Sequence, residues 1–262
     1  MQFPKNSFSL KAIVLASLFG LPASAWSYSD NEEVYNASAE LDAAMEIDNA
    51  LDIANIEILA EQGYVGAQYY LGVMYDKGEG VDQNYSKAFE WFQKAANQGY
   101  GAAQYNIGVM YLKGESVNKN FSKAFEWLQK AANQGYVDAQ YNIGVMYDKG
   151  EGVGQSYSKA FKWYQEAANQ GDDRSQNNLA MMYFKGQGVR QNKAKSLEWW
   201  QKAADQKNSL AQNNLGVIYE GGDGVRQNKA KAKEWYGKAC DNGSQKGCDN
   251  YRELNEQGNP KL

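Results

Sequence analysis

A spacing of 36 residues recurs through most of this 262-residue chain without an insertion or a deletion. Tryptophan, tyrosine and glycine residues all follow this spacing. The recurring residues are Trp91, Trp127, Trp163, Trp199 and Trp235; Tyr75, Tyr111, Tyr147, Tyr183 and Tyr219; and Gly78, Gly114, Gly150, Gly186 and Gly222. Self-similarity at a period of roughly 20 to 50 residues is the signature of a repeat architecture, in which each unit packs on its neighbours. The sequence therefore predicts five repeats, over residues 65–100, 101–136, 137–172, 173–208 and 209–244.

Each repeat contains the pattern of two helices. In the first repeat, apolar residues at helical spacing predict a first helix from near Ala67 to Lys77, and Gly78 suits the residue just past its end. A second helix is predicted from a capping residue, Asn84, to Gly99. The equivalent caps are Asn84, Asn120, Ser156, Asn192 and Asn228. The fold class is therefore all-α, with stacked helix hairpins.

Several segments of the third repeat resemble a known family. They are Ala-Gln-Tyr-Asn-Ile-Gly-Val-Met-Tyr at 139–147, Gly-Glu-Gly-Val at 150–153, Lys-Ala-Phe-Lys-Trp-Tyr at 159–164 and Ala-Ala-Asn-Gln-Gly at 167–171. These segments resemble the Sel-one-like repeat (SLR), a relative of the tetratricopeptide repeat with a longer loop inside each hairpin. The resemblance covers all five repeats and implies a right-handed α-solenoid that serves as a protein-interaction or adaptor module. The fourth repeat departs most from the pattern, at Ser175, Ala180 and Lys207.

The two ends of the array are predicted to be caps. Residues 49–64 resemble the second helix of a preceding half-repeat, and residues 245–262 comprise a polar capping helix and a tail. Residues 26–48 form an acidic segment for which either a loose helix or disorder is expected.

The first 25 residues have the pattern of a cleavable signal peptide. Lys5 and Lys11 precede an apolar run that is too short to span a bilayer, and Ala23-Ser24-Ala25 is a suitable cleavage site. The alternative is a buried N-terminal helix. Cleavage would leave a mature chain that begins at Trp26, and we expect it in the periplasm of a Gram-negative bacterium, with secretion as a further route.

The two cysteines of the chain lie close together near its end. Cys240 takes the place of the alanine that closes the fifth second helix, and Cys248 lies where the next first helix begins. In an oxidising compartment the simplest expectation is a disulfide that stabilises the C-terminal cap. The spacing is also similar to that of cysteine-rich secreted members of the same family.

The composition excludes most of the common kinds of catalytic site. The chain has no histidine, so it lacks the usual triads and the commonest general base, and its net charge of −4 argues against nucleic acid as a partner. Two Ser-x-x-Lys matches, Ser116 to Lys119 and Ser156 to Lys159, have the spacing of penicillin-interacting enzymes but lack the companion motifs. We expect no enzyme activity, no cofactor and no metal site.

The functional surface is expected to be a face of the first helices. In stacks of this type the first helices line the concave side, and the resemblance implies that their outward positions hold a partner protein. The candidate residues are Tyr69, Asp76, Tyr105, Leu112, Tyr141, Asp148, Asn177, Phe184, Asn213 and Glu220. The alternative interpretation is that the tyrosines pack against the neighbouring repeat.

The predicted role is non-catalytic binding of an unidentified envelope or exported protein by a monomer that does not insert into the membrane. Three roles remain open on the sequence. They are an adaptor or regulator in the bacterial envelope, an inhibitor or immunity protein against an exported toxin or receptor, and a hydrolase acting on peptidoglycan or β-lactams.

Overall fold

The computed structural model describes residues 53–258. The predicted signal peptide and the acidic segment lie outside the described residues, as do the first residues of the N-terminal cap and the last four residues of the tail. The chain divides into two compact units, residues 1–119 and residues 120–262, called unit 1 and unit 2 here. Each unit is described by itself.

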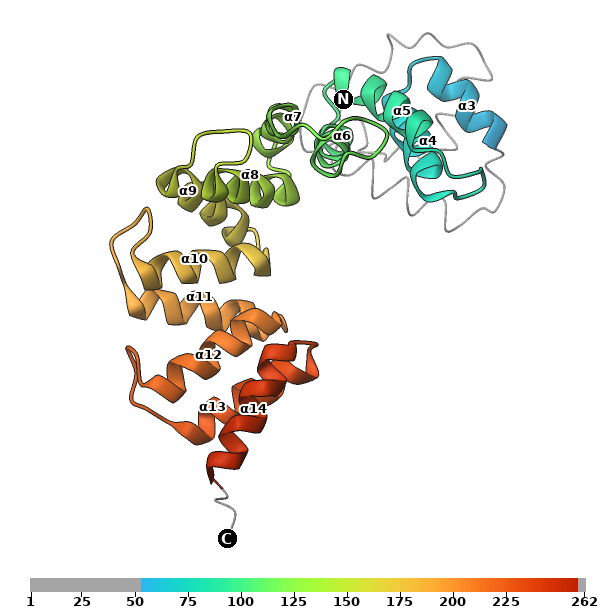
Figure 1. Cartoon of the computed structure of the whole chain (residues 1–262). Coiled ribbons are helices and arrows are strands. Elements are labelled where there is room, and N and C mark those ends of the chain that lie inside the picture. The colour runs from blue at the N-terminus through green and yellow to red at the C-terminus, as the bar shows by residue number, and fades with distance from the viewer. Residues whose placement is uncertain (1–52, 259–262) are drawn as a thin grey trace, which may run out of the picture. The chain divides into compact units, whose positions relative to one another are not determined.

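The described residues form helices joined by turns and loops, which confirms the all-α prediction (Figure 1). Unit 1 contains α3 (Ile53–Glu61), α4 (Val65–Lys77), α5 (Tyr85–Asn97) and α6 (Gly101–Lys113). Unit 2 contains α7 (Phe121–Asn133), α8 (Val137–Lys149), α9 (Tyr157–Asn169), α10 (Asp173–Lys185), α11 (Lys193–Asp205), α12 (Ser209–Gly221), α13 (Lys229–Asp241) and α14 (Gln245–Gly258). Within each unit every helix packs on the next one along the chain, so the hairpins are stacked as predicted.

The helix ends follow from local sequence. The first helix of each repeat begins two residues earlier than predicted, at Val65 in α4, because the residue before it is extended and its carbonyl already accepts from the amide of Gln68. Each of these helices stops at a glycine in the left-handed conformation, such as Gly78 with φ of 75°. The second helices start at the predicted caps, where for example Asn84 Oδ1 accepts from the amide of Lys87 at 3.0 Å.

Small residues allow the two helices of a hairpin to approach closely. A Cβ added to Gly72 would lie 2.6 Å from the ring of Phe92, and a Cβ added to Gly144 would lie 2.6 Å from the ring of Tyr164. Both rings are buried, at 1% exposed. The glycine on the first helix therefore makes room for a large side chain on the second helix, and this contact fills the inside of the hairpin.

A row of buried glutamines joins each hairpin to the helix before it, and the sequence analysis did not identify this row. The glutamines are Gln68, Gln104, Gln140, Gln176 and Gln212. Each donates through Nε2 to the carbonyl of an alanine eight residues earlier, at distances from 3.0 to 3.4 Å. In addition, Gln206 donates to Oε1 of Gln176 at 2.9 Å from a turn 30 residues later. The amide side chain thus satisfies a helix-end carbonyl that would otherwise be buried with fewer partners.

Replacing one of these glutamines is expected to weaken the stack. Gln176→Met keeps the length of the side chain but removes the bond to the Ala168 carbonyl and the acceptor for Gln206. We expect a loss of about 1 to 2 kcal/mol in the free energy of unfolding, measured by urea denaturation. The control is Gln187→Met, in the loop after α10, where the glutamine side chain forms no hydrogen bond with a described residue, and an equal loss in both variants would contradict the assignment.

The fourth repeat compensates for its departures from the pattern. Ala180 replaces the glycine of the other first helices, and its backbone carbonyl accepts from Ser196 Oγ at 2.8 Å. The facing side chain is Trp200, whose indole donates to Asn177 Oδ1 at 3.2 Å. Lys207 adopts the left-handed conformation, with φ of 67°, at a position where the other repeats have glycine. The turn is therefore preserved at the cost of an unfavourable backbone conformation for a non-glycine residue.

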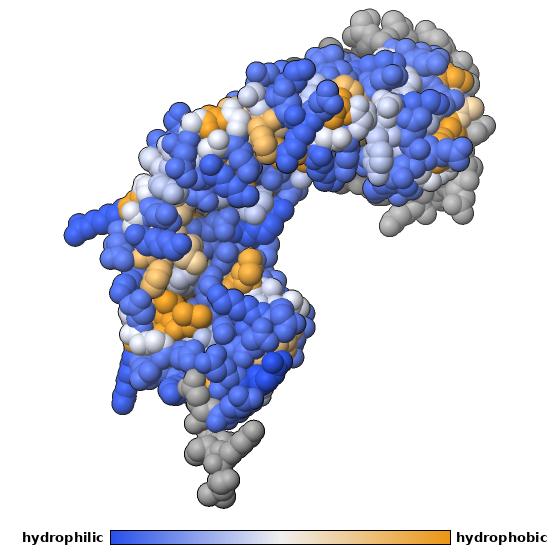
Figure 2. Space-filling model, in the orientation of Figure 1, coloured by the Kyte–Doolittle hydropathy of each residue, from blue (hydrophilic) through white to orange (hydrophobic). Residues whose placement is uncertain are grey.

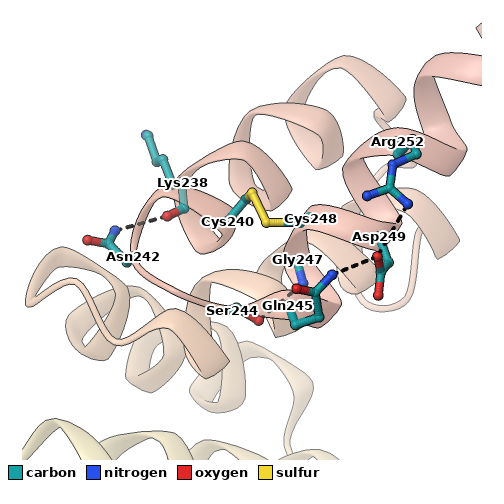
Figure 3. Close-up of a disulfide and its surroundings, with 9 residues drawn as sticks. All are labelled: Lys238, Cys240, Asn242, Ser244, Gln245, Gly247, Cys248, Asp249 and Arg252. Carbon is teal, nitrogen blue, oxygen red and sulfur yellow. Dashed lines mark hydrogen bonds and ion pairs between the residues drawn. A yellow bond between two sulfur atoms is a disulfide. The ribbon is translucent and has the colours of Figure 1, made fainter.

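A disulfide between Cys240 and Cys248 joins α13 to α14, with the two Cα atoms 4.5 Å apart (Figure 3). The separation of eight residues equals that between each buried glutamine and the alanine carbonyl it binds. Cys240 takes the alanine position and Cys248 takes the glutamine position of the same pattern. The covalent bond therefore stands where a hydrogen bond joins the earlier helices. Ser244 supports the start of α14 by accepting from the amide of Gly247 at 3.1 Å.

Candidate binding surface

One stripe of each first helix faces away from the packed interior. In α8 the inward side is buried at Ala139, Ile143 and Met146, whereas Tyr141, Val145 and Asp148 are partly exposed. We call the partly exposed stripe of α4, α6, α8, α10 and α12 the first-helix face. It contains eight of the ten predicted residues, and Asn177 and Asn213 are buried instead.

In unit 1 the candidate residues are partly buried by their own repeat. The Tyr69 ring packs against Tyr100, with centroids 5.0 Å apart, and against Phe92 at 5.7 Å. Burial raises the pKa of the Asp76 carboxyl above its ordinary value, with a smaller contribution in the same direction from Glu115. Tyr105 and Leu112 lie at the equivalent positions of α6 and are also partly exposed. The tyrosines here combine packing with exposure, so the two interpretations from the sequence are not exclusive.

In unit 2 the Tyr141 ring is covered by an arginine of the next repeat. The Arg174 guanidinium lies 4.3 Å from the ring centroid and forms ion pairs with Asp172 at 2.6 Å and Asp138 at 2.5 Å. Burial raises the pKa of the Tyr141 hydroxyl. The Tyr141 ring is therefore already used in a cation–π contact within the protein.

Asn177 and Asn213 correct the sequence prediction, because they are buried and bonded within the stack. Their exposed fractions are 8% and 4%. Asn177 Oδ1 accepts from Trp200 and, at 3.1 Å, from Asn214 of the following repeat. Asn213 Oδ1 accepts from Asn250 at 2.9 Å. An asparagine is shorter than the tyrosine at this position in the first three repeats, so its side chain lies between the helices and forms its hydrogen bonds there.

The candidates Phe184 and Glu220 each contact the second helix of their own hairpin. The Phe184 ring packs on Trp200 at a centroid distance of 5.5 Å. Glu220 accepts from the hydroxyl of Tyr236 at 2.6 Å, and burial, followed by this carboxylate, raises the pKa of that phenol. Part of each side chain is therefore already used in contacts within the hairpin.

Asp148 occupies the position equivalent to Glu220 but does not make the same bond. Its carboxyl is partly exposed, and burial raises its pKa. The facing phenol, Tyr164, is buried, and its hydroxyl has no hydrogen-bond partner among the described residues. An aspartate is one methylene shorter than a glutamate, so the third repeat leaves a carboxyl and a phenol unjoined where the fifth repeat joins them.

An aliphatic row also lies on the first-helix face and was not among the predicted residues. Its members are Val73, Val109, Val145, Met181 and Val217. All are at least partly exposed, and Val217 is 45% exposed on the same side of α12 as Leu210, which is 61% exposed. The row could have been identified from the sequence, because every repeat has an apolar residue at this position, on the side of the helix opposite to the core stripe.

The two Ser-x-x-Lys matches have structural roles. Ser156 caps α9, and its Oγ accepts from the backbone amide of Lys159 at 3.4 Å. The Lys159 ammonium lies over the ring of Tyr147, 5.1 Å from the centroid. Ser116 is a loop residue with φ of 63°. The Ser156 hydroxyl and the Lys159 ammonium are therefore both used in contacts that hold the hairpin together.

Residues 53–258 contain neither a candidate metal site nor a helix that could span a membrane. No cluster of three or more histidine, cysteine, aspartate or glutamate side chains in this part of the chain could hold a metal ion. No helix in the same part combines the length and the apolar character needed to cross a bilayer.

Comparison with known proteins identifies the repeats. The model of the Sel1 repeat matches residues 65–100, 101–136, 137–172, 173–208 and 209–244. No curated protein matches the chain.

Two solved structures are similar over most of the chain. One is a Sel1 repeat protein from Oxalobacter formigenes, with 29% identity and a TM-score of 0.75 over 90% of this chain and 92% of that protein. The other is a protective antigen of uropathogenic Escherichia coli with an SLR fold, with 32% identity and a TM-score of 0.76 over 88% of this chain. The match covers 52% of the Escherichia coli protein, so this chain spans about half of its length.

Proteins built from Sel1 repeats generally mediate protein–protein interactions, and the scaffold is generally non-enzymatic. The matched repeats, the stacked hairpins and the two similar structures agree. The chain belongs to the Sel1 repeat family.

Proposed function

We propose that this protein is an exported, non-catalytic interaction module of the bacterial envelope. It acts as an adaptor or regulator and holds a partner protein on its first-helix face.

The observation that carries this proposal is the contrast between the two sides of the first helices. The packed side keeps one residue type at several positions, as the buried glutamine row shows. The outward side keeps its aliphatic row but varies at other positions. Its position nearest the helix start is Gly66, Ala102, Asp138, Arg174 and Leu210 in the five repeats. Stacking does not require this variation, whereas recognition of an irregular protein surface does.

The chemistry of the face suits a protein partner. Val217 and Leu210 offer exposed aliphatic surface, and Tyr105 offers a partly exposed aromatic ring with a polar end. Large aromatic side chains contribute contact area at a low cost in conformational entropy, and they are enriched at interfaces. A mixed apolar and polar face of this kind is typical of protein–protein contacts.

Export is supported by two independent features. The first 25 residues have the sequence of a signal peptide, and the chain carries a disulfide between its two cysteines. Disulfides form and persist in oxidising compartments such as the periplasm.

The proposal is tested by photo-crosslinking in intact cells. A photoreactive amino acid is placed singly at Leu112, Val145 and Val217 on first helices, and as controls at Glu126, Lys162 and Glu198 on exposed sides of second helices. We expect one envelope protein to be crosslinked from the first-helix positions and not from the controls.

Crosslinking from the second-helix controls alone would contradict the assignment of the face. The identity of the crosslinked protein separates an adaptor from an inhibitor, because an inhibitor is captured with an exported toxin or a receptor. Covalent labelling by a fluorescent penicillin, lost in Ser116→Ala or Ser156→Ala, would overturn the non-catalytic assignment.

A further inference from the structure

The loops before the second helices become more basic from repeat to repeat along the chain. The loops before the second helices carry Asp82, Asn118 and Gly154 at one position in the first three repeats, but Arg190 and Arg226 in the last two. The first residue of the second helix changes in the same way, from aromatic residues to lysines. Those residues are Tyr85, Phe121, Tyr157, Lys193 and Lys229. We call the resulting cluster the basic edge. It comprises Arg190, Lys193, Lys195, Arg226, Lys229 and Lys231.

The α10–α11 and α12–α13 loops that carry the arginines are firmly held. In the first of them, Gln191 Nε2 donates to the Phe184 carbonyl at 2.8 Å, and the amide of Asn192 donates to the Tyr183 carbonyl at 2.8 Å. In the second, Gln227 Nε2 donates to the Glu220 carbonyl at 2.8 Å. Each arginine directly precedes one of these bonded glutamines, so its backbone is fixed before any ligand arrives.

The two loops also belong to neighbouring hairpins that touch at this edge. Lys193, at the start of α11, forms an ion pair with Asp223 of the next loop. A Cβ added to Gly224 would lie 2.9 Å from Lys193 Cβ, which places the start of α11 against that loop. The basic edge is therefore one continuous surface within unit 2.

Half of the cations on the basic edge have no bonded partner among the described residues. Lys193 is paired with Asp223, and Lys195 and Lys231 lie over the rings of Tyr183 and Tyr219. Three side chains are exposed and make no hydrogen bond, ion pair or ring contact with any described residue. These are Arg190, Arg226 and Lys229. The α10–α11 loop has Gln187 where the first three repeats have a glutamate, which removes a further acid.

The shape of this edge favours a flat ligand. Figure 2 shows strongly hydrophilic side chains that project from the side of unit 2 on which Figure 1 draws the α10–α11 and α12–α13 loops. Val189 and Val225, which are partly exposed, directly precede the two arginines. Charged side chains that project from a surface can reach a flat layer of phosphate groups without a groove.

We propose that the basic edge docks the protein peripherally on a membrane surface that carries anionic phospholipids. The cations approach the phosphate groups, and guanidinium and ammonium groups both bind phosphate well. The first-helix face is not used, so this inference does not depend on the partner protein. Attraction of this kind is electrostatic and falls with added salt.

The test is co-sedimentation of the full chain with vesicles of phosphatidylcholine alone, or with vesicles in which about a third of the lipid is phosphatidylglycerol. At low salt we expect at least tenfold stronger partition to the anionic vesicles. In Arg190→Glu/Arg226→Glu/Lys229→Glu this preference is expected to fall by at least tenfold. The charge-matched control is Lys162→Glu/Lys207→Glu/Lys246→Glu, whose lysines are exposed in unit 2 but lie outside the basic edge, and it is expected to retain most of the preference.

Circular dichroism checks that both variants are folded. The proposal is overturned if the two vesicle types bind equally, or if the control loses as much binding as the basic-edge variant. A synthetic peptide of residues 26–52, which contains eight acidic residues and no basic residue, provides the competing outcome. Binding of this peptide to the basic edge, without binding of anionic vesicles, would assign the edge to an acidic polypeptide instead.

Discussion

Gly188→Ala is expected to lower the free energy of unfolding by about 3 to 5 kcal/mol, the largest effect of a single methyl group that we predict for this chain. Gly188 lies in the loop between α10 and α11 with φ of 69°. A Cβ at this position would lie 2.3 Å from the carbonyl oxygen of Tyr157 and 2.4 Å from its carbonyl carbon. These atoms belong to the backbone at the start of α9, so they cannot move aside as a flexible side chain can.

The control for this substitution is Gly171→Ala. Gly171 also has a positive φ, of 99°, but no atom lies within 4 Å of its added Cβ. Only the backbone conformation is penalised there, by about 1 to 2 kcal/mol. The comparison is made by urea denaturation, and equal midpoints for the two variants would show that the contact with Tyr157 is not decisive. Ser116, which has φ of 63° at the equivalent position of the second repeat, shows that a positive φ alone is tolerated.

Removal of the disulfide is expected to have the second largest effect. In Cys240→Ala/Cys248→Ala the nine-residue loop between α13 and α14 is no longer closed in the unfolded chain. The loop-entropy relation gives a loss of about 2.5 kcal/mol. The native protein is expected to show no free thiol in a titration with a thiol reagent, because both cysteines are bonded to each other. Two free thiols in the folded protein would contradict the pairing.

A second variant separates the effect of the covalent bond from the effect of a hydrogen bond at positions 240 and 248. Cys240→Ala/Cys248→Gln restores the residue pair found at the earlier helix junctions, where a glutamine donates to an alanine carbonyl. We expect it to recover about 1 kcal/mol relative to the double alanine variant, because the hydrogen bond of the glutamine row is rebuilt. No recovery would mean that α14 does not approach α13 as the earlier first helices approach the helices before them.

The extent to which the sequence predicted this protein depended on the range of the interactions. The capping of α5 by Asn84 and the turn at Gly78 involve residues only a few positions apart, and the sequence predicted both. The first helices began two residues earlier than expected, because their start is set by an extended residue, which has no side-chain cap in α4, α6 and α8. The repeat register predicted the stacking itself.

The properties of the candidate surface could be predicted less well from the sequence. The position of Asn177 on the outward side followed from helical spacing, but its burial depends on Trp200 and Asn214, which are 23 and 37 residues away. The sequence also gave no reason to separate Asp148 from Glu220. Their difference depends on whether the side chain reaches a phenol on the next helix, and a single methylene decides that.

The sequence by itself determined the number of repeats, the glycines that end the first helices, the caps that start the second helices and the pairing of the cysteines, because these depend on a fixed register and on short-range capping and turn chemistry. Only the tertiary structure decided which outward side chains are accessible, and it showed that the buried glutamines and the disulfide occupy one structural position. The physical reason is that burial and hydrogen bonding join residues about 8 to 37 positions apart, across helices whose approach is set by packing.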